Sequence, residues 1–501
     1  MIDIVSMWQW LVKRTTKTDV IIVIGIITLF FITRLMGILD LPMFTDEAIY
    51  IHWAKLAWKD ASWRFVSLTD GRQPLQTWAT IPLLKLIDDP LLAGRMFGVL
   101  SGLFGFIGFM VLSGYLFGKK TAYIGGLLYL LNPYFLFYDR MAMVDSAVSA
   151  FFTWSLLGTL LLLRFPRLDI AIIYGLIIGL GSLSKSTARV FLLVPALIPI
   201  IWYWGDPKKI RKTINYYLLL GVVVIFMVGL YNIQRLSPFM HFIEGKNLTF
   251  VRTIPQFIAS PFDPLIHNLL TIPEYVGIES AFLLPIFGII GLIVMAKKNM
   301  KLSLFLSASF LIPFGIIASL AAVLFPRYLM FLTIPLFMGM LYLLQQTRYR
   351  MLIIVLYIMS VCYPLWAIYF NLTQLYLPPI DRGQYIEGVT TGYGISNIVE
   401  RIKQDAQGEQ FVYVFTEGTF GLLPYALDIY TTYDYPTIRY EARWPLKEED
   451  FTYARELKKK GNIVYFVFAE REEFNEEWNL RLVKRYLKPI GGKSIYLFDI
   501  E

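Results

Sequence analysis

The chain has almost no cysteine or histidine. Its single cysteine, Cys362, excludes an intramolecular disulfide. The three histidines, His52, His241 and His267, form no spaced pair of the kind that binds zinc. The sequence also contains no internal repeat and no low-complexity segment. These absences exclude a disulfide-stapled domain and give no support to a histidine metal centre.

Charge is scarce as well. Only 17% of the 501 residues are charged, whereas 56% are hydrophobic. The apolar residues gather into runs of about 20, the length that an α-helix needs to cross the hydrocarbon core of a bilayer. This composition excludes a soluble protein and predicts an α-helical polytopic membrane protein. The first run, residues 20–39, is too long for a cleaved signal peptide and has no small-residue cleavage site after it, so we expect it to remain as the first span.

We expect about 11 membrane-spanning helices, an odd number, from runs of this length. They lie near residues 20–39, 91–118, 121–137, 147–163, 170–183, 189–204, 216–233, 281–296, 302–324, 328–344 and 351–370. Lys and Arg cluster in every second loop, as cytoplasmic loops do. This alternation predicts a plasma-membrane protein with a cytoplasmic N-terminus and with loops 40–90 and 236–280 outside. The net charge of +9 therefore indicates orientation and not nucleic-acid binding.

The composition changes after residue 370. The rest of the chain is rich in charge and alternates three strand-like runs with two helix-like stretches. The runs are residues 411–416, 462–469 and 494–500, and the helix-like stretches are residues 448–460 and 472–486. We therefore expect a transmembrane domain over residues 1–371 and an extracytoplasmic α/β domain over residues 372–501. Prolines and glycines between residues 378 and 394 predict a linker between them.

Polar groups recur where the expected spans end on the outer side. They are Asp46 with Glu47, Arg72, Arg95, Arg140 with Asp145, Lys185, and Arg327 with Tyr328. Charged groups at membrane depth are costly, and they tend to mark a ligand pathway or a catalytic cavity. A carboxylate there can deprotonate an incoming hydroxyl, while the basic side chains can hold a phosphate leaving group. The pattern favours phosphate-leaving-group chemistry in one shared outer cavity.

Each group also has a structural interpretation. An acidic pair in a long loop is usually solvated surface. Arg140 can pair with Asp145 or extend to the lipid headgroups, and Arg327 can anchor a span in the same way. Lys185 favours function, because it lies between two apolar runs with hardly any loop around it.

The order of these motifs resembles the GT-C superfamily of lipid-phosphate-sugar glycosyltransferases, particularly the branch of the protein O-mannosyltransferases and the lipid A aminoarabinose transferase. The resemblance covers residues 20–345. Asp46 and Glu47 match the acidic pair of the first external loop, and Arg72-Gln-Pro-Leu75 matches a basic residue before Pro-Pro-Leu, with Gln73 in place of one Pro. The later matches are Ala93-Gly-Arg-Met-Phe97, the segment from Arg140 to Asp145, the Gly-Leu-x-x-Leu-Ser-Lys pattern ending at Lys185 with Ser186 in place of Gly, and Arg327-Tyr328.

This resemblance implies an inverting transfer of a sugar from a polyprenyl-phosphate donor to a protein hydroxyl or to a lipid or glycan of the cell envelope. It implies Asp46 as the general base and Glu47 as a supporting catalytic group. It also implies donor contacts from Arg72, Arg95, Arg140, Lys185, Arg327 and Tyr328, with Asp145 orienting a basic partner or the sugar. The O-mannosyltransferase branch implies no metal, although oligosaccharyl-transferring relatives use one. Loop 236–280, with its five prolines, is expected to gate the cavity.

Two other classes of function stay open at this stage. A flippase or transporter also places charges inside a helical bundle, but typically near the midplane and within repeated halves. A non-catalytic assembly protein would use its outer domain to bind a partner.

Overall fold

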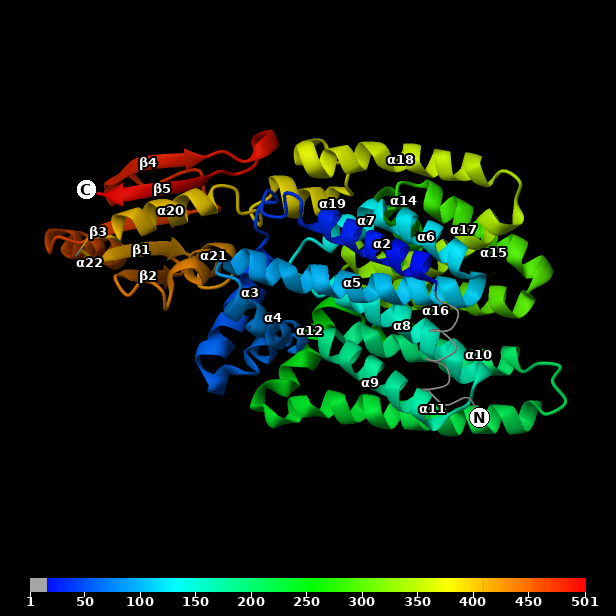
Figure 1. Cartoon of the computed structure of the whole chain (residues 1–501). Helices are drawn as coiled ribbons and strands as arrows, with labels where there is room; N and C mark the ends of the chain where they lie inside the picture. The colour runs from blue at the N-terminus through cyan, green and yellow to red at the C-terminus, as the bar shows by residue number, and fades with distance from the viewer. Residues whose placement is uncertain (1–15, 409) are drawn as a thin grey trace.

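The computed structural model describes residues 16–408 and 410–501. Apolar helices lie side by side in a long bundle, and a small sheet domain stands at one end of it (Figure 1). The helices that overlap the expected spans are α2 (Lys17–Leu35), α5 (Pro90–Phe117), α6 (Lys119–Leu130), α8 (Asp145–Arg164), α9 (Leu168–Ser184), α10 (Leu193–Trp202), α11 (Lys209–Tyr231), α15 (Leu283–Lys298), α16 (Met300–Leu320), α17 (Thr333–Gln346) and α18 (Arg350–Phe370). The predicted helical membrane architecture is confirmed.

The number of spans is less clear-cut than the sequence suggests. Among the described residues, seven helices are long and apolar enough to cross a membrane, or eight if α14 (Asp263–Glu279) and α15 form one bent span. The segments Leu168–Ser184 and Ser186–Trp202 are apolar but shorter. The expected span at residues 121–137 is broken, because Pro133 starts a separate helix, α7 (Pro133–Tyr138), whose first turn is capped by the Asn132 side chain.

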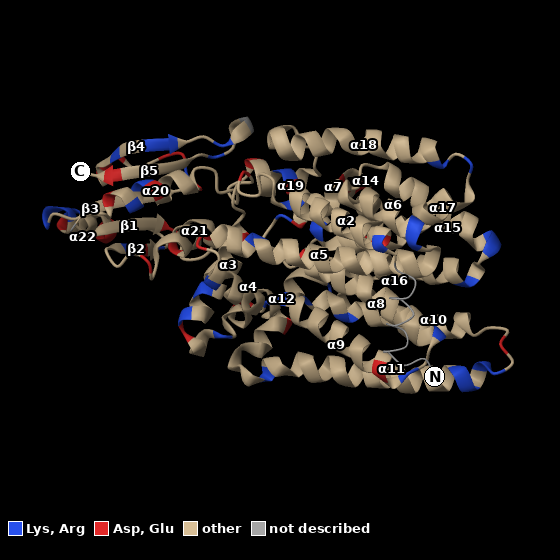
Figure 2. Cartoon of the chain, viewed as in Figure 1, with Lys and Arg blue, Asp and Glu red and all other residues tan. Residues whose placement is uncertain are grey.

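Basic residues gather at the end of the bundle that lies away from the sheet domain (Figure 2). The loops between α10 and α11, α15 and α16, and α17 and α18 all turn at that end (Figure 1). The predicted orientation requires this separation, because it puts the basic loops on one side of a membrane and the sheet domain on the other.

The C-terminal part is a mixed α/β domain, as the sequence predicts. Its sheet has the strand order β2-β1-β3-β5-β4, with β1 parallel to β2 and β3, and β5 antiparallel to β3 and β4. The strands are β1 (Val412–Glu417), β2 (Ile438–Arg443), β3 (Ile463–Phe468), β4 (Leu480–Tyr486) and β5 (Ile495–Ile500), and the helices are α20 (Ile395–Asp405), α21 (Leu422–Thr431) and α22 (Glu448–Lys459).

One element of this domain was predicted wrongly. The stretch 472–486 is not a helix: its second half is β4, an edge strand that pairs with β5. Exposed basic side chains such as Arg481 and Lys484 give β4 a mixed polar pattern that resembles the exposed side of a helix. Charged side chains are, however, also typical of an edge strand. Pairing with β5, which the local pattern does not encode, decides the outcome. Strand β2 was missed altogether.

The sheet domain docks on α3 (Thr45–Lys59), the helix that follows the first span. His52 on α3 lies 2.6 Å from Asp428 of α21, and its ring stacks on Tyr425. The Lys55 ammonium donates to Asp434 at 2.6 Å and to the Ile429 carbonyl at 2.9 Å. These contacts fix α3, whose first turn carries Asp46 and Glu47.

Candidate active site

A cavity of about 620 Å³ opens beside the first turn of α3. Its wall is built from segments far apart in the chain: α3, the residues after η2 (Val66–Asp70), the start of α8, the end of α9, α12 (Phe242–Phe250), α16 and η6 (Pro326–Leu332). Of the sequence-predicted site residues, Asp46, Arg72, Asp145, Lys185, Arg327 and Tyr328 line it. The structure therefore brings together six residues that the sequence spreads over 283 positions.

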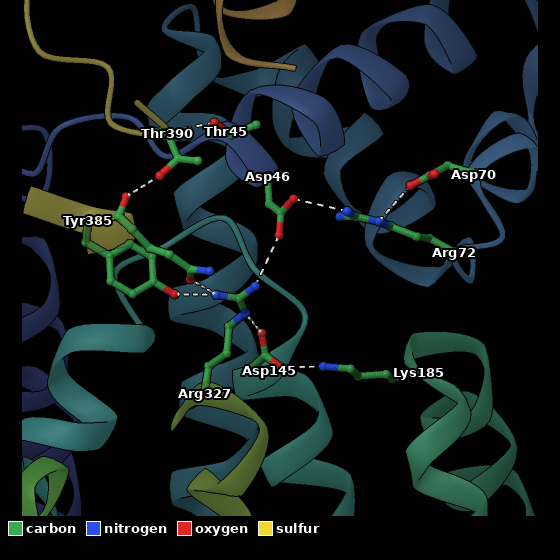
Figure 3. A network of polar contacts seen from close by, with 10 residues as sticks. Thr45, Asp46, Asp70, Arg72, Asp145, Lys185, Arg327, Tyr385 and Thr390 are labelled. Carbon is green, nitrogen blue, oxygen red and sulfur yellow. Dashed lines mark hydrogen bonds and ion pairs between the residues drawn. The ribbon is translucent and has the colours of Figure 1, made fainter. Parts of the chain in front are cut away.

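Asp46 lies between two arginines (Figure 3). Its Oδ1 is 3.1 Å from Arg72 Nη2, and its Oδ2 is 3.4 Å from Arg327 Nη2. Burial alone would raise the pKa of the Asp46 carboxyl, but the Arg72 and Arg327 guanidinium groups outweigh burial and hold that pKa below its ordinary value. Asp46 is therefore ionised at neutral pH, with both oxygens directed at groups that also suit a phosphate.

A second acid, Asp145, begins α8 deeper in the same cavity. Its Oδ1 is 2.9 Å from Lys185 Nζ, and its Oδ2 is 3.8 Å from Arg327 Nε. The Lys185 ammonium also lies 3.4 Å from the centre of the Tyr328 ring. Asp145 is thus paired with Lys185 and not with Arg140, and it contacts two basic groups of the cavity (Figure 3).

Three predicted site residues lie outside the cavity. Glu47 and Arg95 form a fully buried pair, with Arg95 Nε 2.9 Å from Glu47 Oε1 and Arg95 Nη2 2.9 Å from Oε2. Arg140 is also buried, and its Nη2 donates to the carbonyls of Met36 and Gly37 at 2.8 and 2.7 Å. These positions suit support of the backbone around the site, not contact with a ligand.

Several residues of the polar network were not predicted from the sequence. Asp70 forms ion pairs with Arg72, whose Nε is 3.0 Å from Oδ2, and with Lys246, whose Nζ is 2.8 Å from Oδ1. Lys246 lies on α12, in the predicted gate loop. Gly71 permits this approach: it has φ of +67°, and a Cβ there would meet Phe242 O and Lys246 Cβ at 2.5 Å. The Arg327 Nη1 donates to Gln384 and, at 2.8 Å, to the Tyr385 hydroxyl, both from the predicted linker.

The cavity has one polar and one apolar side. Four basic side chains (Arg72, Lys185, Lys246 and Arg327) surround the acids Asp46, Asp70 and Asp145, which leaves one positive charge in excess. The apolar side is formed mainly by α16 and the segments next to it, through Pro313, Ile316, Ile317, Leu320, Phe250 and Phe331. Such a site suits an amphipathic anion with one polar end and one hydrocarbon end.

Comparisons with known proteins agree with this architecture. Residues 72–231 match the family model of dolichyl-phosphate-mannose-protein mannosyltransferases. ArnT from Cupriavidus metallidurans bound to undecaprenyl phosphate superposes with a TM-score of 0.60 at 14% identity, over 97% of this chain and 98% of that one. The chain has the GT-C fold.

Other solved GT-C structures show the same likeness. The apo state of the same ArnT gives a TM-score of 0.56 at 14% identity, over 96% of this chain and 97% of that one. The Archaeoglobus fulgidus oligosaccharyltransferase AglB, in complex with an inhibitory peptide and a dolichol-phosphate, gives 0.50 at 11% identity, over 90% and 69% of the two chains. No curated protein sequence matches the chain significantly. The GT-C resemblance predicted from motif order is therefore confirmed at the level of fold.

The structure shows no ready-made metal centre in the part of the chain that it describes. Among residues 16–408 and 410–501, no group of three or more His, Cys, Asp or Glu side chains could hold a metal ion. The acids at the cavity are instead all paired with Lys or Arg.

Proposed function

We propose that this protein is a membrane glycosyltransferase that moves a sugar from a polyprenyl-phosphate donor to an acceptor hydroxyl, with inversion at the anomeric carbon. The observation that carries the proposal is Asp46, an ionised carboxylate between Arg72 and Arg327 at the polar end of a cavity with an apolar wall. The family model and the GT-C fold support the same class of reaction.

In the proposed reaction, the donor phosphate replaces Asp46 as the partner of the basic side chains in the cavity. A donor phosphodiester carries one negative charge, which matches the excess positive charge of the site. When its oxygens bind Arg72, Arg327 and Lys185, Asp46 loses ion-pair partners and can accept a proton from the acceptor hydroxyl. The hydroxyl oxygen attacks the anomeric carbon, the bond to the phosphate oxygen breaks, and the basic groups stabilise the polyprenyl phosphate that leaves.

The proposal also includes the domain boundaries, the membrane orientation and the acceptor class. Residues 1–371 form the membrane domain, residues 372–501 form an extracytoplasmic domain, and the N-terminus is cytoplasmic. The acceptor is a protein hydroxyl or a lipid or glycan of the cell envelope, and the polyprenyl tail packs along α16.

A reconstituted assay tests the function. The purified protein, in liposomes, is given a polyprenyl-phosphate sugar labelled in both the lipid and the sugar, with hexose and pentose donors in separate reactions. Release of polyprenyl phosphate with transfer of the sugar supports the transferase. Movement of the intact donor between leaflets without cleavage supports a flippase, and neither event supports an assembly protein.

Charge removal at Lys185 is expected to weaken donor binding. Lys185→Gln keeps the length of the side chain but removes one of the positive charges, and loss of a charge-assisted hydrogen bond corresponds to roughly a 10-fold weaker affinity. Equilibrium binding of polyprenyl phosphate in nanodiscs measures this. Lys209→Gln on α11, outside the cavity, is the matched control. Unchanged affinity in Lys185→Gln would count against a phosphate contact.

In the structure, backbone hydrogen bonds join the proposed gate loop to the wall of the cavity. Val251, just after α12, forms an antiparallel bridge with Ala321, just after α16, in the wall of the cavity. Arg252 N donates to Leu320 O at 2.8 Å, and Ala322 N donates to Phe250 O at 2.9 Å. On the same segment, α13 (Ile254–Ala259) exposes large apolar side chains, as expected at a lipid surface.

Locking this bridge is expected to stop donor binding. Val251 and Ala321 are a non-hydrogen-bonded pair, so their Cα atoms are about 4.5 Å apart, close enough for a disulfide. Because Cys362 is the only native cysteine, a Cys362→Ser background makes Val251→Cys with Ala321→Cys a clean cross-link. Oxidation should block donor uptake and a reductant should restore it, with each single Cys variant as control. Full uptake by the cross-linked protein would show that this wall need not open.

A further inference from the structure

The segment that follows the last helix of the bundle enters the candidate active site. We call residues 375–391 the strap; it contains α19 (Pro379–Arg382) and the helical turn η8 (Gly383–Glu387). Its Gln384 and Thr390 line the cavity, and Tyr385 lies beside the Arg327 guanidinium (Figure 3). A flexible tether between two domains would not be buried in this way: Tyr385 is 3% exposed.

The strap is held at both ends by contacts with the elements that carry the site. At its start, the buried Tyr138 hydroxyl of α7 donates to Asp381. At its end, the Thr45 backbone N and Oγ1 each donate to Thr390 O at 3.0 Å, immediately before Asp46. Thr391 also forms an antiparallel bridge with Phe44. The strap is thus fixed relative to both Asp46 and Arg327.

The strap occupies one corner of the Arg327 guanidinium. Nη1 donates to Gln384 Oε1 and to the Tyr385 hydroxyl, the latter at 2.8 Å. Nη2 makes only a long contact of 3.4 Å with Asp46, and the buried Nε, 3.8 Å from Asp145, has no hydrogen-bond partner among the described residues. The Nε–Nη2 edge, which can bind two phosphate oxygens side by side, is therefore the edge left to a ligand.

We infer that Gln384 and Tyr385 are positioning residues that hold Arg327 with its Nε–Nη2 edge toward the donor phosphate. The inference rests on the proposed transferase function and adds two residues to it. Without the strap, the guanidinium could rotate to form a two-point pair with Asp46 or Asp145. Such a pair would remove a phosphate contact, and at Asp46 it would also occupy the oxygens that accept the proton.

Tyr385→Phe is the sharpest variant, because it keeps the ring that packs on Phe44 and Phe137 and removes only the hydroxyl. Loss of one hydrogen bond to a charged group is expected to lower kcat/KM roughly 10-fold. Gln384→Met, which removes the other acceptor at similar size, should act in the same direction. Tyr376→Phe, exposed at the start of the same strap, is the matched control and should keep wild-type activity.

A double-mutant cycle separates positioning from a general structural effect. If Tyr385 acts through Arg327, Tyr385→Phe should have little further effect in an Arg327→Lys background, because the planar donor that it orients is gone. Additive losses, or wild-type kcat/KM in both strap variants, would overturn the assignment. A wild-type protein that releases no polyprenyl phosphate would instead overturn the proposed function on which it rests.

Discussion

Asp46→Asn is expected to abolish sugar transfer while the protein still binds its donor. Asn cannot accept the proton of the acceptor hydroxyl, and removal of a general base lowers a rate by roughly 10²–10⁴-fold. The substitution also removes the carboxylate that competes with a phosphate for Arg72 and Arg327, so donor affinity should stay the same or increase. Single-turnover transfer and polyprenyl-phosphate binding, measured on the same preparation, check both halves of this expectation.

The pH profile gives an independent check of the same role. Because the pKa of Asp46 lies below its ordinary value, the carboxylate is lost only as the pH falls below about 4, where an ordinary aspartate titrates. In kcat/KM, which reports the groups of the ligand-free enzyme, Asp46 should therefore cause no loss between neutral pH and about pH 5. Full activity in Asp46→Asn, or loss of donor binding in that variant, would remove the base assignment.

The sequence predicted the main charged residues of the cavity wall. Asp46, Arg72, Asp145, Lys185 and Arg327 were found because charge is rare in this chain and each lies at the end of an apolar run. These residues come together because the helical bundle places the ends of those apolar runs on one side. The lengths and positions of the apolar runs are enough to predict such a bundle.

What the sequence could not show is which neighbour faces the cavity. Asp46 and Glu47 are adjacent, but successive residues on a helix point about 100° apart, so one carboxylate reaches the cavity and the other the protein interior. Only the rotation of α3 decides between them, and α3 packs against α21, α4 and α5. The sequence signal was the same for both residues.

The strap was hidden for a different reason. Gln384 and Tyr385 reach Arg327 from 57 and 58 positions away, and they lie in a glycine-rich stretch that is typical of a linker. Neither has a local pattern that marks a site. Packing of the strap against α7 and α3 creates their role, and such long-range contacts cannot be read from composition.

Glu47→Gln is expected to damage folding, unlike the substitution of its neighbour. Glu47 accepts four hydrogen bonds: two from Arg95, and one each from the backbone N of Phe44 (2.9 Å) and of Ala142 (2.8 Å). Gln offers one acceptor oxygen and places an N–H against a donor, and it leaves the Arg95 charge buried without its counter-ion. Removing one partner of a buried pair costs about 3–5 kcal/mol of stability.

The comparison of the two adjacent variants makes this expectation specific. Both remove one negative charge from the first turn of α3, yet Asp46 is partly exposed at a cavity, whereas Glu47 is fully buried. In the same detergent, Glu47→Gln should therefore unfold at a clearly lower temperature than the wild type, while Asp46→Asn should unfold near it. Combining Glu47→Leu with Arg95→Met should recover only part of the loss, since the amides of Phe44 and Ala142 still lack an acceptor. If Glu47→Gln were as stable as Asp46→Asn but inactive, Glu47 would have to act in the reaction itself and not as support for the backbone around it.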